Sequence, residues 1–110
     1  MYKMYIDSTT RFEKEVVLKK VENSEEVEMG RKFGDIDMVV SIKELLEENN
    51  LSVSDIDEVT PNLGPGSFTG LKMGVTIANI INWANGKKTI KELYLPNYGS
   101  EPNITKKKFN

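Results

Sequence analysis

Residues 64–74 have the sequence Gly64-Pro65-Gly66-Ser67-Phe68-Thr69-Gly70-Leu71-Lys72-Met73-Gly74. These glycines and the proline stand between a short segment rich in β-forming residues and a long apolar segment with helical periodicity. Glycine permits positive φ and the close approach of another group, but each glycine inside a helix costs about 1 kcal/mol relative to alanine. The stretch therefore predicts a backbone that must stay bare, for a bound phosphate, a tight turn or a closely packed helix.

Two interpretations of the glycine segment remain open from its spacing. Gly64 and Gly66 would expose backbone N–H groups at a helix N-terminus, which favours an anion. The spacing nevertheless differs from the P-loop and from the dinucleotide fingerprint, because Gly70 comes one residue late. The alternative is a tight strand-to-helix turn with Ser67 or Thr69 as the helix cap.

Asp7 follows the first predicted strand and is the carboxylate that would accompany a phosphate. In the nucleotide hypothesis it holds a magnesium ion, and the site consists of Asp7, Gly64, Gly66 and Ser67. A lone aspartate at a strand end is also a common turn residue. No pair of carboxylates in the sequence has a spacing diagnostic of a metal site, so no metal ligands are predicted.

Outward from the glycine segment, the hydrophobic periodicity predicts an α/β domain with the order β-β-β-α-β-α-β. Strands are expected over residues 2–6, 15–21, 26–33, 58–63 and 89–95, and helices over residues 36–49 and 68–85. The first three strands form an antiparallel meander, and the later ones are parallel. Asp35 can cap the first helix, and Asp37 suits the positive end of its dipole. Pro61 is awkward if the fourth strand is central.

The second predicted helix is more apolar than one contact with a sheet requires, since its apolar arc spans about 220°. Gly70, Gly74 and Ala78 form a stripe of small residues, and Met73, Ile77 and Ile80 belong to a bulky stripe. Small residues at this spacing allow two helices to approach closely. We expect the first helix beside the second, and a partner chain across both. The residues predicted at that interface are Met38, Ile42, Gly70, Met73, Gly74, Ile77, Ala78 and Ile81.

Composition excludes several classes of function. The 110 residues suffice for one domain, predicted over residues 1–95, with an irregular tail over residues 96–110. The formal net charge of −2 gives no electrostatic reason to expect direct nucleic-acid binding. The chain has no cysteine and no histidine, which excludes disulfides, thiol nucleophiles and histidine bases or ligands. The N-terminus has no signal peptide and no segment could span a membrane, so a cytoplasmic location is expected.

Gly64–Gly70, followed by Leu71-Lys72-Met73-Gly74, resembles the GPGSFTG-x-R-x-G signature of the TsaB family, also called YeaZ. Residues 4–10 resemble that family's I-D-T-S/T opening strand, and residues 42–57 resemble the stretch before its signature. Lys72 stands where arginine is usual, and the chain is about half as long as is usual in the family. The resemblance implies a ribonuclease-H-like fold, one lobe of the actin/Hsp70 type of ATPase.

The resemblance also implies a role in making threonylcarbamoyladenosine beside the anticodon of tRNAs. TsaB-like proteins act as non-catalytic scaffolds that pair with a catalytic TsaD-like partner, on which a TsaE-like ATPase assembles. The same resemblance implies that tRNA is contacted only indirectly, and that a homodimer is an alternative when the partner is absent. No cofactor is expected of such a scaffold. The competing hypothesis is a nucleotide- and magnesium-binding half of an ATPase or a small-molecule kinase lobe.

Overall fold

The computed structural model describes residues 1–66, 68–86 and 94. Its elements in chain order are β1 (Tyr2–Asp7), β2 (Lys14–Glu22), β3 (Glu25–Gly34), α1 (Met38–Glu48), the short 3-10 helix η1 (Val53–Asp55), β4 (Ile56–Pro61) and α2 (Phe68–Ala84). The predicted order is confirmed from the first strand to the second helix. The predicted fifth strand over residues 89–95 and the tail over residues 96–110 lie, Tyr94 apart, outside the described residues.

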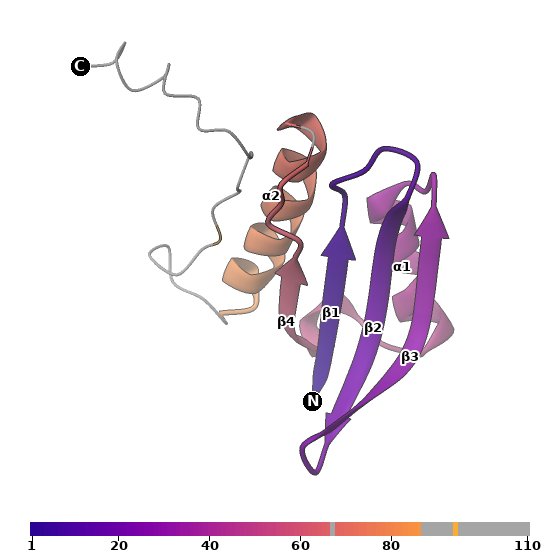
Figure 1. The fold of residues 1–110 in the computed structure, drawn as a ribbon. Coiled ribbons are helices and arrows are strands. Elements are labelled where there is room, and N and C mark those ends of the chain that lie inside the picture. The colour runs from indigo at the N-terminus through magenta and orange to yellow at the C-terminus, as the bar shows by residue number, and fades with distance from the viewer. Residues whose placement is uncertain (67, 87–93, 95–110) are drawn as a thin grey trace, which may run out of the picture.

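The four described strands form one mixed sheet in the order β3-β2-β1-β4 (Figure 1). β1 pairs antiparallel with β2, β2 pairs antiparallel with β3, and β4 runs parallel to β1. The predicted meander followed by a parallel strand is therefore correct. Pro61 ends β4 at the edge of this described sheet, and an edge strand tolerates a residue without an N–H group.

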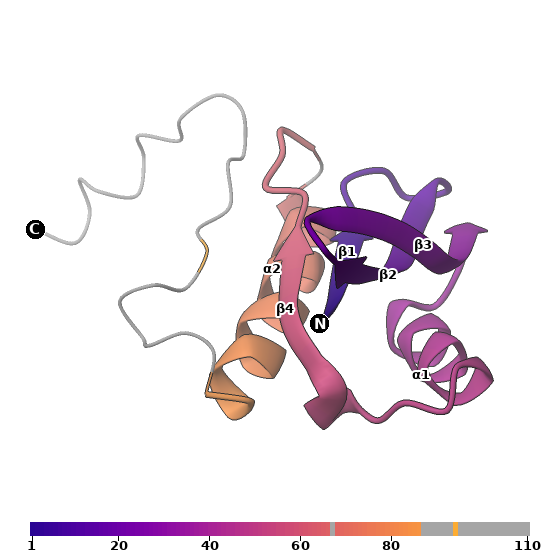
Figure 2. The same cartoon turned by 90° about the horizontal axis from the view of Figure 1, so that it is seen from below.

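One face of the sheet carries both helices, which lie behind the strands in Figure 1; Figure 2 shows α2 on the left and α1 on the right, apart from each other. Strand alternation turns Met4 and Ile6 of β1 toward the helices, with Val16 and Leu18 of β2 directly opposite them and Val59 of β4 on the other side. All five side chains are buried. α1 covers β2 and β3, and α2 covers β4 and β1. The core therefore lies between one sheet face and two helices.

The start of α1 differs from the sequence-based expectation by two residues. Asp37, rather than Asp35, is the N-cap, and its carboxylate accepts the Val40 N–H at 3.0 Å. Asp35 instead lies 3.6 Å from the Lys14 amino group. A Cβ on Gly30 of β3 would lie 2.7 Å from Leu45 Cδ2, so a bare backbone at residue 30 lets α1 pack closely on the sheet.

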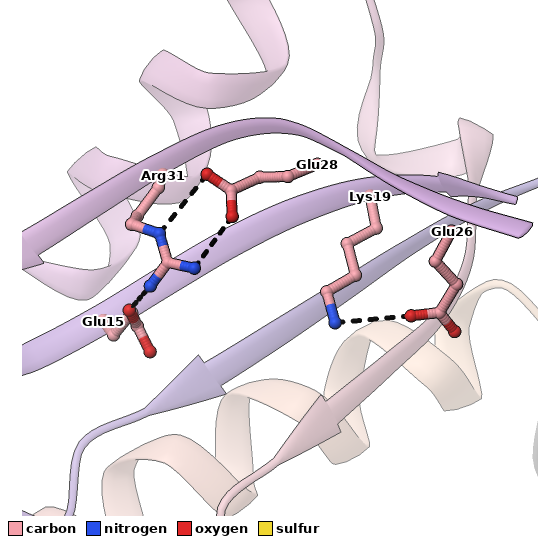
Figure 3. Close-up of polar contacts among 5 residues, drawn as sticks. All are labelled: Glu15, Lys19, Glu26, Glu28 and Arg31. Carbon is pink, nitrogen blue, oxygen red and sulfur yellow. Dashed lines mark hydrogen bonds and ion pairs between the residues drawn. The ribbon is translucent and has the colours of Figure 1, made fainter.

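The opposite face of the sheet carries charged side chains that pair within β3 and between β2 and β3 (Figure 3). Arg31 binds Glu28 with its Nη2 atom at 2.8 Å and also pairs with Glu15, and Lys19 lies 3.4 Å from Glu26. Exposed ion pairs of this kind contribute at most about 1 kcal/mol each. Their effect here is to keep the helix-free face polar. Among the described residues, no helix is both long and apolar enough to cross a lipid bilayer.

Candidate functional site: the glycine segment and the groove between the helices

The glycine segment packs against the turn that follows β1, at the end of the sheet where α2 begins (Figure 1). Ser8 is 3% exposed, and its hydroxyl donates a hydrogen bond to the Gly70 carbonyl oxygen at 2.5 Å. A Cβ on Gly74 would lie 2.4 Å from Ser8 Oγ. The first turns of α2 can therefore rest on β1 only because residue 74 has no side chain.

Gly66 and Gly64 have separate reasons to be glycine. A Cβ on Gly66 would lie 2.6 Å from Thr9 Cβ and 2.9 Å from the Thr9 carbonyl oxygen. Gly64 has φ of 107°, a value that L side chains rarely adopt, and its N–H donates to Asn62 Oδ1 at 3.0 Å. The sequence left several reasons for these glycines open. This geometry explains them by close packing and a tight turn.

Asp7 is held by hydrogen bonds from uncharged donors. Its Oδ1 atom accepts the Thr9 N–H at 2.9 Å and the Thr9 hydroxyl at 2.7 Å, and its Oδ2 atom accepts the Asn62 side-chain amide at 3.1 Å. Burial raises the pKa of Asp7, but these hydrogen bonds outweigh burial and hold the pKa below its ordinary value. Burial, reinforced by the Asp7 charge, raises the pKa of the neighbouring Tyr5.

The residues of the nucleotide hypothesis are thus brought together only in part. Asn62 joins Asp7 to Gly64, and Gly66 packs on Thr9, whereas Ser67 lies outside the described residues. No group of three acidic side chains within residues 1–66 and 68–86 could hold a metal ion. Sequence reasoning missed Asn62, although a polar residue directly after β4 was a usable signal. Calorimetry with magnesium and ATP tests this hypothesis, since binding tighter than about 100 μM corresponds to more than about 5 kcal/mol and would favour it.

We expect Asp7→Asn to reduce the free energy of unfolding by about 1 kcal/mol at pH 7, since a hydrogen bond to a charged acceptor is lost at a half-buried position. The folded state favours the carboxylate, because the folded pKa lies below the unfolded pKa of about 3.9. Its stabilisation is complete above the unfolded pKa and declines as the pH falls through the folded pKa. Urea unfolding from pH 7 to pH 2.5 should show the two proteins converging. Asp35→Asn, whose side chain is 66% exposed, is the control; a constant gap for Asp7→Asn would contradict the assignment.

A groove of about 410 Å³ lies between α1 and α2 on the side away from the sheet. Its lining is mostly apolar and comprises Val39, Ile42, Lys43, Leu46, Glu47, Leu51, Ser52, Val53, Ile77, Ile80 and Ile81. Val39 and Ile80 on its rim are 64% and 59% exposed. A second hollow shares Val39 and Ile77 with the groove and extends it toward Met38 and Met73. The two helices therefore present a continuous apolar surface to the outside.

The structure divides the predicted interface residues into two groups. Ile42, Ile77 and Ile81 line the groove, and Met38 and Met73 line the adjoining hollow, although Met38 is only 2% exposed. The stripe of Gly70, Gly74 and Ala78 instead faces the chain's own sheet. The expectation that this stripe meets a second helix is corrected, because Ser8 occupies the space beside Gly74. Val39 and Ile80 were missed, although both belong to apolar arcs visible in the sequence.

The family model described as TsaD, tRNA N6-adenosine threonylcarbamoyltransferase, matches residues 35–91, which is more than half of the chain. The chain belongs to the TsaD family. The matched range includes β4, the glycine segment, and the two helices α1 and α2, whose side chains line most of the groove.

Two solved structures share the fold of this TsaD-family chain. YeaZ from Pseudomonas aeruginosa matches with a TM-score of 0.64 and 18% identity over 78% of this chain. A crystal structure of an uncharacterized protein with similarity to peptidase YEAZ, also from Pseudomonas aeruginosa, matches with a TM-score of 0.61 and 18% identity over 78% of this chain. The chain spans 40% of the length of each. The resemblance to TsaB/YeaZ and the α/β fold that it implied are confirmed.

Proposed function

We propose that this chain is a non-catalytic subunit in tRNA threonylcarbamoyladenosine modification, and that it binds a TsaD-like catalytic partner through the groove between α1 and α2. Membership of the TsaD family and the YeaZ-like fold support the role in tRNA threonylcarbamoyladenosine modification. The observation that carries the binding role is the open apolar groove, whose rim residues Val39 and Ile80 are more than half exposed.

An amphipathic helix of the partner suits this groove. Two helices lying side by side leave a furrow that apolar side chains spaced three and four residues apart can enter, which is a recurring mode of peptide recognition. Ile42, Ile77 and Ile81 form its floor, while Lys43 and Glu47 supply one charge of each sign at its border. The partner helix would bury the rim side chains that α1 and α2 leave in water.

The polar residues near the glycine segment have a structural role, which suits a binding subunit better than a catalytic one. Asp7 and Ser8 are engaged in hydrogen bonds that hold β1 to the glycine segment. The sequence supplies no histidine or cysteine, and its net charge is −2. In the proposed complex the TsaD-like partner therefore supplies catalysis and the contact with tRNA, and a TsaE-like ATPase is a further component. A homodimer through the same groove is an alternative when the partner is absent.

Ile80→Glu tests this proposal. We expect it to weaken binding of the TsaD-like chain from the same genome by about 20-fold or more, because a carboxylate replaces an anchor that would be desolvated. Isothermal titration calorimetry measures the affinity. Ile80 is exposed in the free chain, so the variant should retain the wild-type circular dichroism spectrum.

Phe33→Glu is the matched control for Ile80→Glu. Phe33 is 61% exposed. The neighbouring Lys32 points to the helix face of the sheet, because its amino group lies 2.9 Å from Glu48 of α1, so strand alternation places the Phe33 side chain on the other face. Phe33 therefore belongs to the helix-free face, and Phe33→Glu should bind like the wild type. Equal affinities for both variants would remove the groove from the interface, whereas a loss with Phe33→Glu alone would place the interface on the opposite face.

A further inference from the structure

Two asparagines of α2, and Asn85 directly after its end, turn their side-chain amides toward backbone groups beyond the helix. Asn82 is 1% exposed; its Oδ1 atom accepts the Val59 N–H and its Nδ2 atom donates to the Val59 carbonyl, both at 2.8 Å. Asn85 donates to the carbonyl oxygens of Val53 and Ile56 at 2.9 and 3.1 Å. A primary amide that both donates to and accepts from one residue reproduces the pairing of a neighbouring strand.

These contacts lie on the outer edge of β4, where α2 runs beside the strand (Figure 1). The Asn62 N–H donates to the Ile6 carbonyl of β1 at 2.8 Å. Since the N–H and C=O groups of successive residues in a strand alternate in direction, those of Val59 and Pro61 point away from β1. The N–H and C=O groups of Val59 are already hydrogen-bonded to Asn82, and Pro61 has no N–H group. This part of the edge is closed to another strand.

Asn79, one helical turn before Asn82, makes the same kind of pair with a residue far along the chain. Its Oδ1 atom accepts the Tyr94 N–H at 2.8 Å, and its Nδ2 atom donates to the Tyr94 carbonyl at 3.0 Å. The Tyr94 hydroxyl donates to Glu58 Oε2 of β4 at 3.0 Å, and its side chain packs against the core. The backbone of Tyr94 is thus bound to Asn79 of α2, and its hydroxyl is bound to Glu58 of β4.

We propose that Asn79 and Glu58 form a docking site for one extended residue with a hydroxylated aromatic side chain, and that the chain fills this site with its own Tyr94. The amide of Asn79 recognises the peptide backbone, and the carboxylate of Glu58 selects tyrosine over phenylalanine through a charge-assisted hydrogen bond. The docked residue anchors the chain that follows α2 at the edge of β4, next to the stretch that Asn82 closes.

The connection between α2 and residue 94 is long enough for the chain to fill its own site. Seven residues lie between Gly86 and Tyr94, so the eight Cα–Cα steps reach at most about 29 Å, whereas a helical rise over the positions from Asn79 to Gly86 covers only about 10 Å. A connection this short also gives the tethered residue a high effective concentration relative to a residue from a second molecule. We therefore assign the occupant to the same chain.

Amide hydrogen exchange of the full chain, measured residue by residue by NMR, tests the docking site. We expect Asn79→Ala to accelerate exchange of the residue 94 amide at least tenfold and to leave the Val59 amide, which Asn82 protects, unchanged. Thr76→Ala, an exposed substitution one turn earlier on α2, should change neither rate. An unprotected residue 94 in the wild type, or equal rates in wild type and Asn79→Ala, would overturn the proposal.

Tyr94→Phe provides a second test that leaves α2 untouched. It removes only the hydroxyl bound to Glu58, and we expect exchange at residue 94 to rise about threefold; an unchanged rate would refute the selection of tyrosine. The protection must also be independent of protein concentration. Protection that disappears on dilution would show that a second copy supplies the residue, and would overturn the assignment to the same chain.

Discussion

Gly74→Ala is expected to lower the free energy of unfolding by about 3 kcal/mol. The new Cβ would lie 2.4 Å from Ser8 Oγ, so the buried hydroxyl would have to turn away from the Gly70 carbonyl or α2 would have to move off the sheet. Overpacking costs about 1–3 kcal/mol and loss of a buried hydrogen bond a similar amount, against a gain of about 1 kcal/mol from alanine in a helix. Urea unfolding measures the loss.

The same substitution should reverse its sign in a Ser8→Ala background. Without the hydroxyl, the nearest side-chain atom is Cβ of residue 8 at 3.5 Å, which is ordinary contact. Alanine at position 74 then retains only its helix-propensity gain of about 1 kcal/mol. The double-mutant cycle should give a coupling of about 4 kcal/mol between positions 8 and 74. Additive effects of the two substitutions would show that α2 does not rest on Ser8.

Gly66→Ala is expected to cost about 3 kcal/mol through a contact that no side-chain change can relieve. Its Cβ would meet the Thr9 carbonyl oxygen at 2.9 Å and the Thr9 Cα at 3.0 Å, so backbone must move. Because Gly66 does not have a positive φ, the conformation itself admits alanine, and the loss reports the contact. Urea unfolding again measures the effect.

The Gly66→Ala result is interpreted beside two further variants. Thr69→Ala changes an exposed side chain of the same motif and should alter stability by less than about 0.5 kcal/mol. Thr9→Ala keeps the Cβ that lies 2.6 Å from the new one and should not rescue Gly66→Ala. Wild-type stability of Gly66→Ala would mean that the glycine segment is not packed against the turn after β1.

Local patterns in the sequence were sufficient to predict the order and approximate bounds of the described elements. Alternation along β1 and β2 and the apolar arc of α1 each depend on residues close in sequence, and these are the signals that periodicity captures. The N-cap was misplaced by two residues because Asp35 and Asp37 are chemically equivalent candidates. Capping depends on where the chain turns, which tertiary packing decides.

The candidate site was predicted less completely, because it depends on contacts between distant residues. Helical periodicity shows that α2 has a small and a bulky stripe, but either could face the sheet. The contact between Ser8 and Gly70, 62 positions apart, decides the orientation. The roles of Asn79 and Asn82 were equally hidden, since an asparagine on a helix usually belongs to a solvated face, and nothing nearby in sequence reveals its backbone partner.

The separation between the turn after β1 and the start of α2 has a consequence for folding kinetics. Contacts between residues 8 and 70 close a loop of more than half the chain, and the entropy of that closure must be overcome before they form. They should therefore be absent from the folding transition state. Gly74→Ala and Gly66→Ala would then leave the refolding rate nearly unchanged and accelerate unfolding. The contacts between the turn after β1 and the start of α2 would therefore govern the lifetime of the native state.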